Sequence, residues 1–279
     1  MGIFPAWLVA GLLVGQAAPA DRQSQPDAPQ AAIDAFLAEA EGYTITQRGT
    51  KDVALELMPK PLLHWANPAR NGEDGAVFVW LKDGRPEVIG SVFEYPARGA
   101  VVRKHAFHSL SDQPLVAESA GVEVWAPKAA GLKFAPVEGA EAPADTPRRR
   151  LSQMRELARQ FSLELVDLRE SKSELRLMTQ PLVRYEPKAG PVQDGAIFAF
   201  AIGTDPEALL ILESRRSGDA FRWEFAFARF HFVTISAQHN GKAVWSVEPD
   251  PDMMRTAFGR GDPQREKIYY SVVKAITTP

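Results

Sequence analysis

Two acidic residues each recur 120 positions later, and the four carboxylates could act together in catalysis or in binding a cation. Asp74 and Glu87 reappear as Asp194 and Glu207, each 120 residues later. If the two segments met across a pseudo-twofold axis, their carboxylates would pair for acid–base catalysis or for binding a cation. The same residues also have a structural interpretation, because Asp-Gly makes the turn that enters a strand and Pro-Glu opens the next strand. We favour the structural interpretation, because residues shared by two copies usually encode the shared fold.

The five histidines form no metal-binding pattern, and no motif for a catalytic nucleophile is present. His105 and His108 are three residues apart, which directs them to opposite faces of an alternating strand. The chain has no Cys, no G-x-S-x-G, no H-E-x-x-H and no Gly-rich phosphate loop. We therefore predict no catalytic residue, no metal site and no cofactor.

Aromatic residues lie on or beside several predicted strands and suit either a core or a ligand surface. They include Trp65, Trp80, Tyr95, Trp125, Tyr185, Phe200, Trp223 and Trp245. Aromatic rings on a curved sheet can line a ligand pocket or a carbohydrate platform. Core packing is their commoner role, and we favour it here.

The loop at residues 64–74 is the strongest candidate for a binding site. It differs more than the rest of its segment from its counterpart 120 positions later. Binding residues concentrate on loops, so a site specific to one copy is expected there. Trp65, Asn67 and Arg70 are the candidate binding residues.

The spacing of 120 residues extends over a long segment and decides the predicted architecture. Residues 55–93 align without a gap with residues 175–213, and twelve of these 39 positions are identical. Chance would give roughly two or three identities. The positions shared in the first copy are Leu55, Leu57, Met58, Pro61, Leu62, Ala69, Asp74, Gly75, Ala76, Phe78, Pro86 and Glu87. A repeated period indicates a repeated supersecondary unit, and we expect two tandem repeats.

The composition is that of a globular protein with a sizeable core. The chain has 279 residues, of which 45% are hydrophobic and 24% are charged, and its net charge is −3. This balance gives no electrostatic reason to expect nucleic acid as a partner. A small molecule or an envelope component is the expected kind of partner.

The N-terminal residues have the features of a secretory signal. Residues 3–14 are apolar and uncharged, and the small residues Ala17, Ala18 and Ala20 follow. The run is short for a membrane span. We therefore predict a signal peptide at 1–20, a spacer at 21–30 and an exported protein, periplasmic or secreted, with no membrane span after signal removal. The alternative is an uncleaved N-terminal anchor.

Each repeat is expected to contain one helix followed by strands. Thr146 and Pro147 form a helix start, and an apolar stripe runs from Leu151 to Phe161 at helical spacing. A similar stripe at Ile33–Ala40 matches it at an offset of 121 residues, so we expect one residue gained or lost between helix and first strand. Repeat 1 spans 31–127, a linker of low order spans 128–146, repeat 2 spans 147–247, and a C-terminal extension spans 248–279.

Alternating apolar residues after each helix predict an antiparallel meander of about six strands. The strands at 76–81 and 196–201 are apolar on both faces, so both faces of the sheet must be covered. We expect the helix to cover one face and the other copy to cover the second face. The fold class is therefore α+β, mainly antiparallel β.

Three segments of the first half resemble a group of uncharacterised exported bacterial proteins. They are L-x-W-x-N-P at residues 63–68, G-x-x-F-x-W at 75–80 and D-G-R-P-E-V at 83–88. The second half, at 150–161 and 175–203, is also similar to that group. The resemblance implies export and implies no activity.

These observations favour an exported protein with a binding or structural role in the cell envelope over an enzyme. The alternative function is a hydrolase or other enzyme whose site lies between the two repeats. A cleft lined by acids with shifted pKa values would favour the enzyme.

Overall fold

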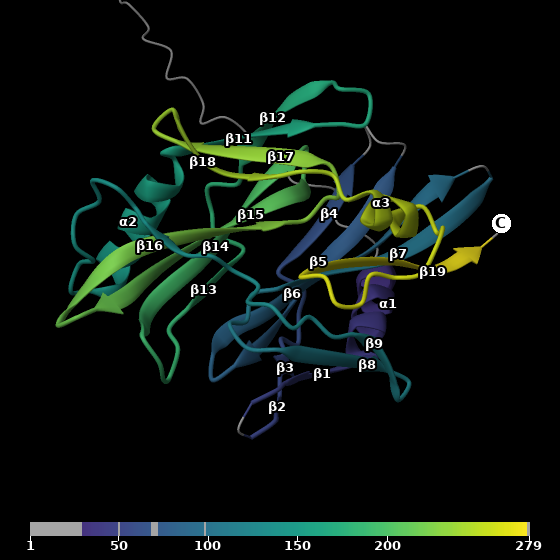
Figure 1. Ribbon diagram of the computed structural model, residues 1–279, viewed down its shortest axis with the longest axis horizontal. Coiled ribbons are helices and arrows are strands. Elements are labelled where there is room, and N and C mark those ends of the chain that lie inside the picture. Colours follow the sequence, from purple (N-terminus) through teal and green to yellow (C-terminus); the bar gives the residue numbers. More distant parts are fainter. Residues whose placement is uncertain (1–29, 50, 68–71, 98, 278–279) are drawn as a thin grey trace, which may run out of the picture.

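The computed structural model describes residues 30–49, 51–67, 72–97 and 99–277 (Figure 1). Antiparallel strands make up most of this part of the chain, together with three helices. The predicted α+β class, mainly antiparallel β, is therefore confirmed. The predicted signal peptide, most of the spacer and Arg70 lie outside the described residues.

The first half begins with a helix and continues as strands. Its elements are α1 (Gln30–Glu41), β1 (Tyr43–Gln47), β2 (Val53–Ala54), β3 (Glu56–Leu57), β4 (Leu63–Asn67), β5 (Glu73–Lys82), β6 (Arg85–Ala97), β7 (Ala100–Ser109), β8 (Leu115–Ser119) and β9 (Val122–Trp125). They form a sheet in the order β2-β1-β8-β9 and a second sheet in which β7, β6, β5 and β3 are consecutive, with β4 also on β5.

The second half has a similar succession of elements, preceded by the short strand β10. They are β10 (Ala135–Pro136), α2 (Pro147–Ala158), β11 (Phe161–Val166), β12 (Lys172–Leu177), β13 (Val183–Tyr185), β14 (Val192–Ile202), β15 (Asp205–Ser217), β16 (Ala220–Arg229), β17 (Thr234–His239) and β18 (Lys242–Val247). One sheet contains them in the order β10-β16-β15-β14-β12-β11-β17-β18, with β13 also on β14.

The strand order differs from that of a simple meander. In each half three long strands follow one another as neighbours, β5–β6–β7 and β14–β15–β16. The first strand of each half instead pairs with a much later one, β1 with β8 and β11 with β17. The predicted strand at residues 55–65 is also split into β3 and β4, because Pro61 lies between them and cannot donate to the ladder.

The two halves pair their long strands in the same register. Gly75 is opposite Phe93 in the first half, and Gly195 is opposite Glu213 in the second. A register shift follows Trp80 in one ladder and Phe200 in the other. In each case the partner positions are 120 residues apart.

The expected helix offset of 121 residues is wrong. The buried residues of α1 are Phe36 and Ala40, and α2 buries Met154 and Ala158, which lie 118 residues later. The first strands keep this offset, since Ile45 is opposite Ala117 and Leu163 is opposite Ala237. The difference in length therefore lies after the first strand. The connection is longer in the second half, where β11 and β12 form a hairpin.

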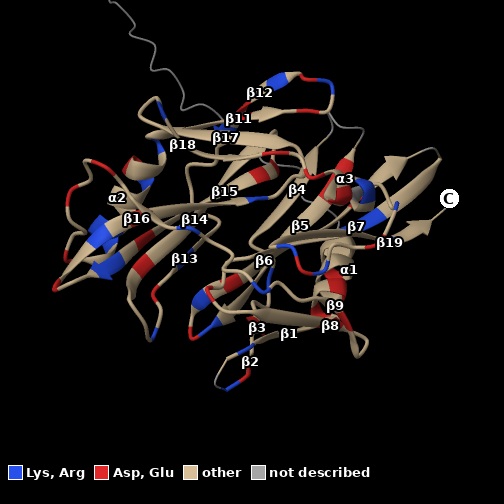
Figure 2. Ribbon diagram, in the orientation of Figure 1, with Lys and Arg blue, Asp and Glu red and all other residues tan. Residues whose placement is uncertain are grey.

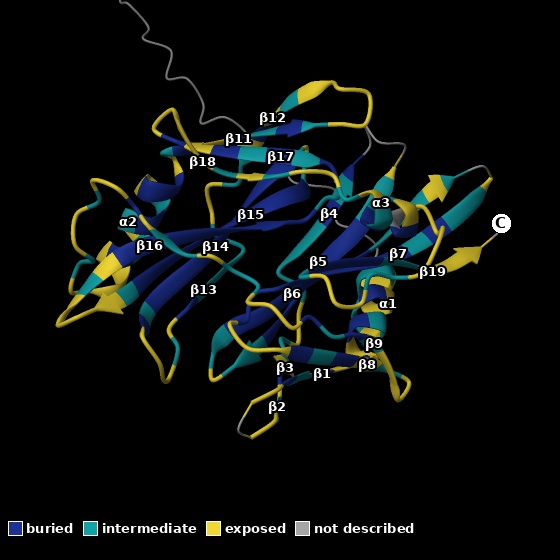
Figure 3. Ribbon diagram, in the orientation of Figure 1, coloured by how far each residue is buried: buried dark blue, intermediate teal, exposed yellow. Residues whose placement is uncertain are grey.

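Each long sheet is buried on both faces (Figure 3). Phe78 packs in a cluster with Phe36 of α1, and Phe198 packs in a cluster with Met154 of α2. The opposite faces meet each other, because Val77 and Ile197 belong to one cluster with residues of both halves. Charged residues are sparse along the middle of the long strands (Figure 2). The protein is therefore layered as helix, sheet, sheet, helix.

The linker and the C-terminal extension are parts of this body. Linker residues form β10, which pairs with β16, and Val137 is buried. The extension contains α3 (Pro251–Ala257) and β19 (Tyr269–Thr277). Strand β19 pairs with β7 of the first half (Figure 1), so the chain returns to the first sheet after completing the second.

Among the helices of the described residues, none is long and apolar enough to cross a membrane.

Candidate functional site

A cleft between the two halves is lined by a buried lysine and by several aromatic side chains. It has a volume of about 330 Å³ and is lined by residues of β5, β6, β7 and β15, by the segment before β17, and by Tyr269 of β19. A second cleft of about 710 Å³ lies between other parts of the halves, and its lining includes Gln47, Lys82 and Arg215. We call these the first cleft and the second cleft.

A buried lysine lines the first cleft. Lys104 is on β7 opposite Phe93 of β6, and it is 5% exposed. Its Nζ lies 5.4 Å from the ring centre of Phe93, 5.8 Å from that of Tyr95 and 5.7 Å from that of Phe232. These distances are typical of cation–π interactions.

Burial makes the charged form of this lysine costly. Desolvation lowers the pKa of Lys104 to about 8, and the negative charge of Glu73 opposes that shift. Within the described part of the chain, no carboxylate forms an ion pair with Lys104. The amine therefore changes its charge close to neutral pH.

Acidic and aromatic residues complete the wall of the first cleft. Glu73, Asp205 and Glu207 line it, and each has interactions of its own within the protein. Tyr269 donates a hydrogen bond from its hydroxyl to the carbonyl of Phe230 at 3.1 Å. Burial keeps the pKa of Tyr269 above its usual value, so this hydroxyl remains protonated as a donor.

Exposed apolar side chains lie on the wall of the first cleft. Leu168 is 51% exposed and Phe258 is 53% exposed, and both belong to the lining. The ring of Phe258 packs edge-on against Phe232 at 5.6 Å between centroids. An apolar surface thus continues from the ring beside Lys104 to solvent.

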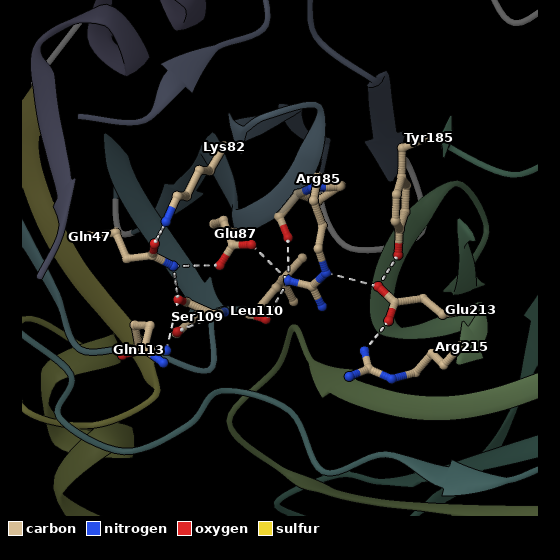
Figure 4. A network of polar contacts seen from close by, with 12 residues as sticks. Gln47, Lys82, Arg85, Glu87, Ser109, Leu110, Gln113, Tyr185, Glu213 and Arg215 are labelled. Atoms are coloured by element: carbon tan, nitrogen blue, oxygen red, sulfur yellow. Dashed lines mark hydrogen bonds and ion pairs between the residues drawn. The ribbon is translucent and has the colours of Figure 1, made fainter. Parts of the chain in front are cut away.

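The second cleft is bordered by a polar network that joins the halves (Figure 4). Arg85 donates to Glu87 of its own strand at 2.8 Å and to Glu213 of β15 at 3.1 Å. Glu213 is fully buried, accepts a hydrogen bond from Tyr185 at 2.8 Å, and forms an ion pair with Arg215. Each charge in this network is paired.

The two clefts use corresponding positions with different chemistry. Residues 120 apart occupy the same places in the two strand registers, as the pairs Phe93–Lys104 and Glu213–Glu224 show. Glu224 is bound by Arg215, which is 3.2 Å away. The position corresponding to Arg215 is Tyr95, an aromatic ring. Lys104 therefore faces aromatic rings at a place where the second half has ion pairs.

The four spaced carboxylates have separate environments. Asp194 is fully buried and accepts hydrogen bonds from Arg150 at 2.7 Å and Arg184 at 2.6 Å. Asp74 lies 2.8 Å from His64, and Glu87 binds Arg85. These contacts fit the structural interpretation of Asp74, Asp194 and Glu87. Glu207 lines the first cleft, and its counterpart Glu87 lines the second.

Two of the three predicted binding residues lie in the described structure. Trp65 on β4 is buried, lines the first cleft, and its indole nitrogen donates to Ser91 at 3.4 Å. Asn67 is buried at the end of β4 and is not part of the cleft lining. Arg70 lies outside the described residues.

Neither Lys104 nor Phe93 was predicted from the sequence to lie at a binding site, whereas Phe232 belongs to an aromatic cluster that the sequence shows at residues 221–232. Lys104 stands between Arg103 and His105, and polar neighbours of this kind give no indication of a buried position. A signal was present in the comparison of the two halves. Phe93 stands where the second half has Glu213, and Lys104 stands where it has Glu224. Lys104 is buried and Phe93 is partly buried.

The two histidines of β7 behave as buried structural groups. His105 lies 2.6 Å from the Tyr43 hydroxyl and contacts Glu39, and burial lowers its pKa to about 4. His108 is on the other face of β7, beside Tyr269. Among the described residues, no group of three or more His, Cys, Asp or Glu side chains is arranged to hold a metal ion.

Comparisons with protein-family models, with curated proteins and with solved structures found no match.

The Arg85 network predicts a large loss of stability on removal of its central cation. Arg85→Met should lower the free energy of unfolding by about 3–5 kcal/mol, because Glu87 and Glu213 would lose a buried partner. Urea denaturation measures this change. Lys172→Met is the control, since its ion pair with Glu164 is exposed and should contribute no more than about 1 kcal/mol. Equal effects of the two substitutions would contradict the assignment.

Lys104 predicts a gain of stability in alkaline solution. The lysine is protonated up to about pH 10.5 when unfolded but only to about pH 8 when folded. Between these values the unfolded chain binds more protons, so stability rises with pH. Across this pH range, the free energy of unfolding of the wild type should rise by on the order of 3 kcal/mol relative to that of Lys104→Met. Denaturation at pH 7.5, 9 and 10 tests this, and a constant difference between the two proteins would refute it.

Proposed function

We propose that the protein is an exported binding protein that holds a small organic molecule in the first cleft, between two tandemly duplicated halves. The observation that carries the proposal is Lys104, a buried cation that faces a cleft without an ionic partner among the described residues. A cation held in this way has a binding site for an anionic group beside it. A cell-envelope role fits the apolar N-terminal residues and the resemblance to exported bacterial proteins.

The duplication is supported by the strand registers. The ladders β5–β6 and β14–β15 pair residues that are 120 apart and change register at corresponding positions. The helices α1 and α2 each pack on the outer face of their own sheet. Repeated units that each leave one apolar face uncovered bury those faces against each other, and this relation places the clefts between the halves.

A role in binding is favoured over a purely structural role because the interface contains an open cleft. Pockets of a few hundred Å³ with apolar walls and a few polar groups are typical of small-molecule sites. The aromatic and exposed apolar lining of the first cleft has this character. The second candidate function is an enzyme, favoured by the low pKa of Lys104, since an amine near neutrality can attack a carbonyl carbon.

Native mass spectrometry of the protein purified from its source tests the binding role. We expect a non-covalent small molecule to accompany the wild type. It should be lost from Ala106→Leu, because Ala106 is buried and lines the first cleft. Ala226→Leu is the matched control: it is the corresponding buried position of β16, away from the cleft lining, and the molecule should remain bound.

An empty wild type, or a molecule retained by Ala106→Leu, would contradict the proposed site. A mass increase that becomes permanent after borohydride reduction would instead support the enzyme, because it reports an imine on a lysine. The same preparation reports the mature N-terminus, which we expect near Ala17 or Ala20.

A further inference from the structure

We propose that the ligand of the first cleft is a monocarboxylic acid with an apolar body, whose carboxylate pairs with Lys104. The inference rests on the proposed function and specifies the chemistry of its ligand.

The first step is the absence of a direct ion pair to Lys104 among the described residues, although the charge of Glu73 acts on its ammonium. Other buried cations of the protein have strong acceptors: Arg150 binds Asp194, and Arg229 donates to the carbonyls of His231, Glu248 and Val233. In the described residues Lys104 has neither a carboxylate nor a hydrogen-bond acceptor bound to its Nζ. A buried ammonium without such partners is costly. A ligand anion would supply the missing partner.

The second step is the aromatic wall around the ammonium. Phe93, Tyr95 and Phe232 each attract the ammonium through a cation–π interaction, which stabilises the charge without neutralising it. The same rings present flat apolar surface to the cleft. A ligand whose charged group reaches Lys104 would therefore place its remaining atoms against these rings, and this position suits a hydrocarbon chain or an aromatic ring.

The third step concerns the other charges of the cleft. Glu73, Asp167, Asp205 and Glu207 also line it, against Lys104 and Arg169 as the cations. An anion with several charges, such as a phosphate, would be repelled by these carboxylates. A single carboxylate that contacts Lys104 directly gains one ion pair at the smallest repulsive cost. The charge pattern therefore selects a monoanion.

The fourth step is the size and opening of the cleft. A volume of about 330 Å³ fits a small organic molecule. The exposed side chains Leu168 and Phe258 continue the apolar surface toward solvent. They would cover the end of the ligand opposite to its carboxylate, and their burial on binding explains why two large apolar residues are exposed there.

Calorimetric titration with three compounds that share one apolar body tests the assignment. Octanoate, octanamide and octylamine differ only in the charge and hydrogen-bonding of the head group. Wild-type protein should bind octanoate at least tenfold more tightly than octanamide and should bind octylamine most weakly. In Lys104→Met the preference for octanoate over octanamide should disappear, because the cation that distinguishes them is gone.

Two controls separate this role of Lys104 from a general effect on folding. Lys104→Met removes a buried charge, and we expect this variant to fold. Binding of octanamide with the same affinity as the wild type would show that the cleft is intact. Lys82→Met alters a lysine of the second cleft and should leave all three affinities unchanged.

The assignment is overturned if octanamide binds the wild type as tightly as octanoate, or if Lys104→Met keeps the preference for the acid. It is also overturned if octanoate does not bind at millimolar concentration. None of these results decides the proposed function, which depends separately on whether a molecule accompanies the native protein and leaves Ala106→Leu.

Discussion

The structure depends on the contact between two sheets that are each apolar on both faces. Along their central residues, the strands β5 and β14 have no polar side that could face water, so isolated halves would expose the cluster that includes Val77, Ile89, Ile197 and Leu209. Burying that surface contributes about 25 cal/mol per Å² of apolar area. The helices cover the outer faces, and the second sheet covers the inner ones. The two clefts lie at the edges of this contact, where the two sheets are no longer packed against each other.

The two clefts lie at two edges of this contact, and corresponding residues of the two halves have different chemistry there. At the second cleft, Arg85, Glu213 and Arg215 satisfy one another across the interface, and the cost of burying their charges is offset by mutual attraction. At the first cleft, Phe93 and Tyr95 replace two of these charges. Lys104 then has cation–π contacts and the nearby charge of Glu73, but no ion pair among the described residues. In the described residues, the charged positions are thus paired at one edge, while Lys104 at the other edge has no ion pair.

Much of the fold could be predicted from the sequence, because periodicity reports burial directly. The apolar alternation at residues 76–81 and 196–201 indicated both that these are strands and that both of their faces are covered. The pairing of β1 with β8 could not be predicted, since β8 is a short strand far along the chain and contacts of that kind leave no local signal. The predicted helix offset was wrong because the apolar stripes of two helices can be matched at several spacings. Only the strand partners distinguish an offset of 118 residues from one of 121.

The candidate site was predictable only in part. Trp65 was identified from the divergent loop, and it does line the first cleft, but Lys104 was not, because a lysine between Arg103 and His105 has the sequence appearance of an exposed residue. Its burial arises from β6, from the segment after β16 and from β19, three elements far apart in sequence. Tertiary contacts of this kind determine which polar residues are buried away from water. In the sequence, only the comparison of corresponding residues in the two halves indicated that Lys104 is unusual.

Native-state hydrogen exchange of the full-length protein, followed by mass spectrometry, tests the shared interface most directly. Since neither sheet can keep its inner face buried without the other, the amides of β6 and β15 should exchange with one common free energy, that of global unfolding. Two separate free energies, with one sheet still protected after the other has opened, would show that the halves are independent and would contradict this account.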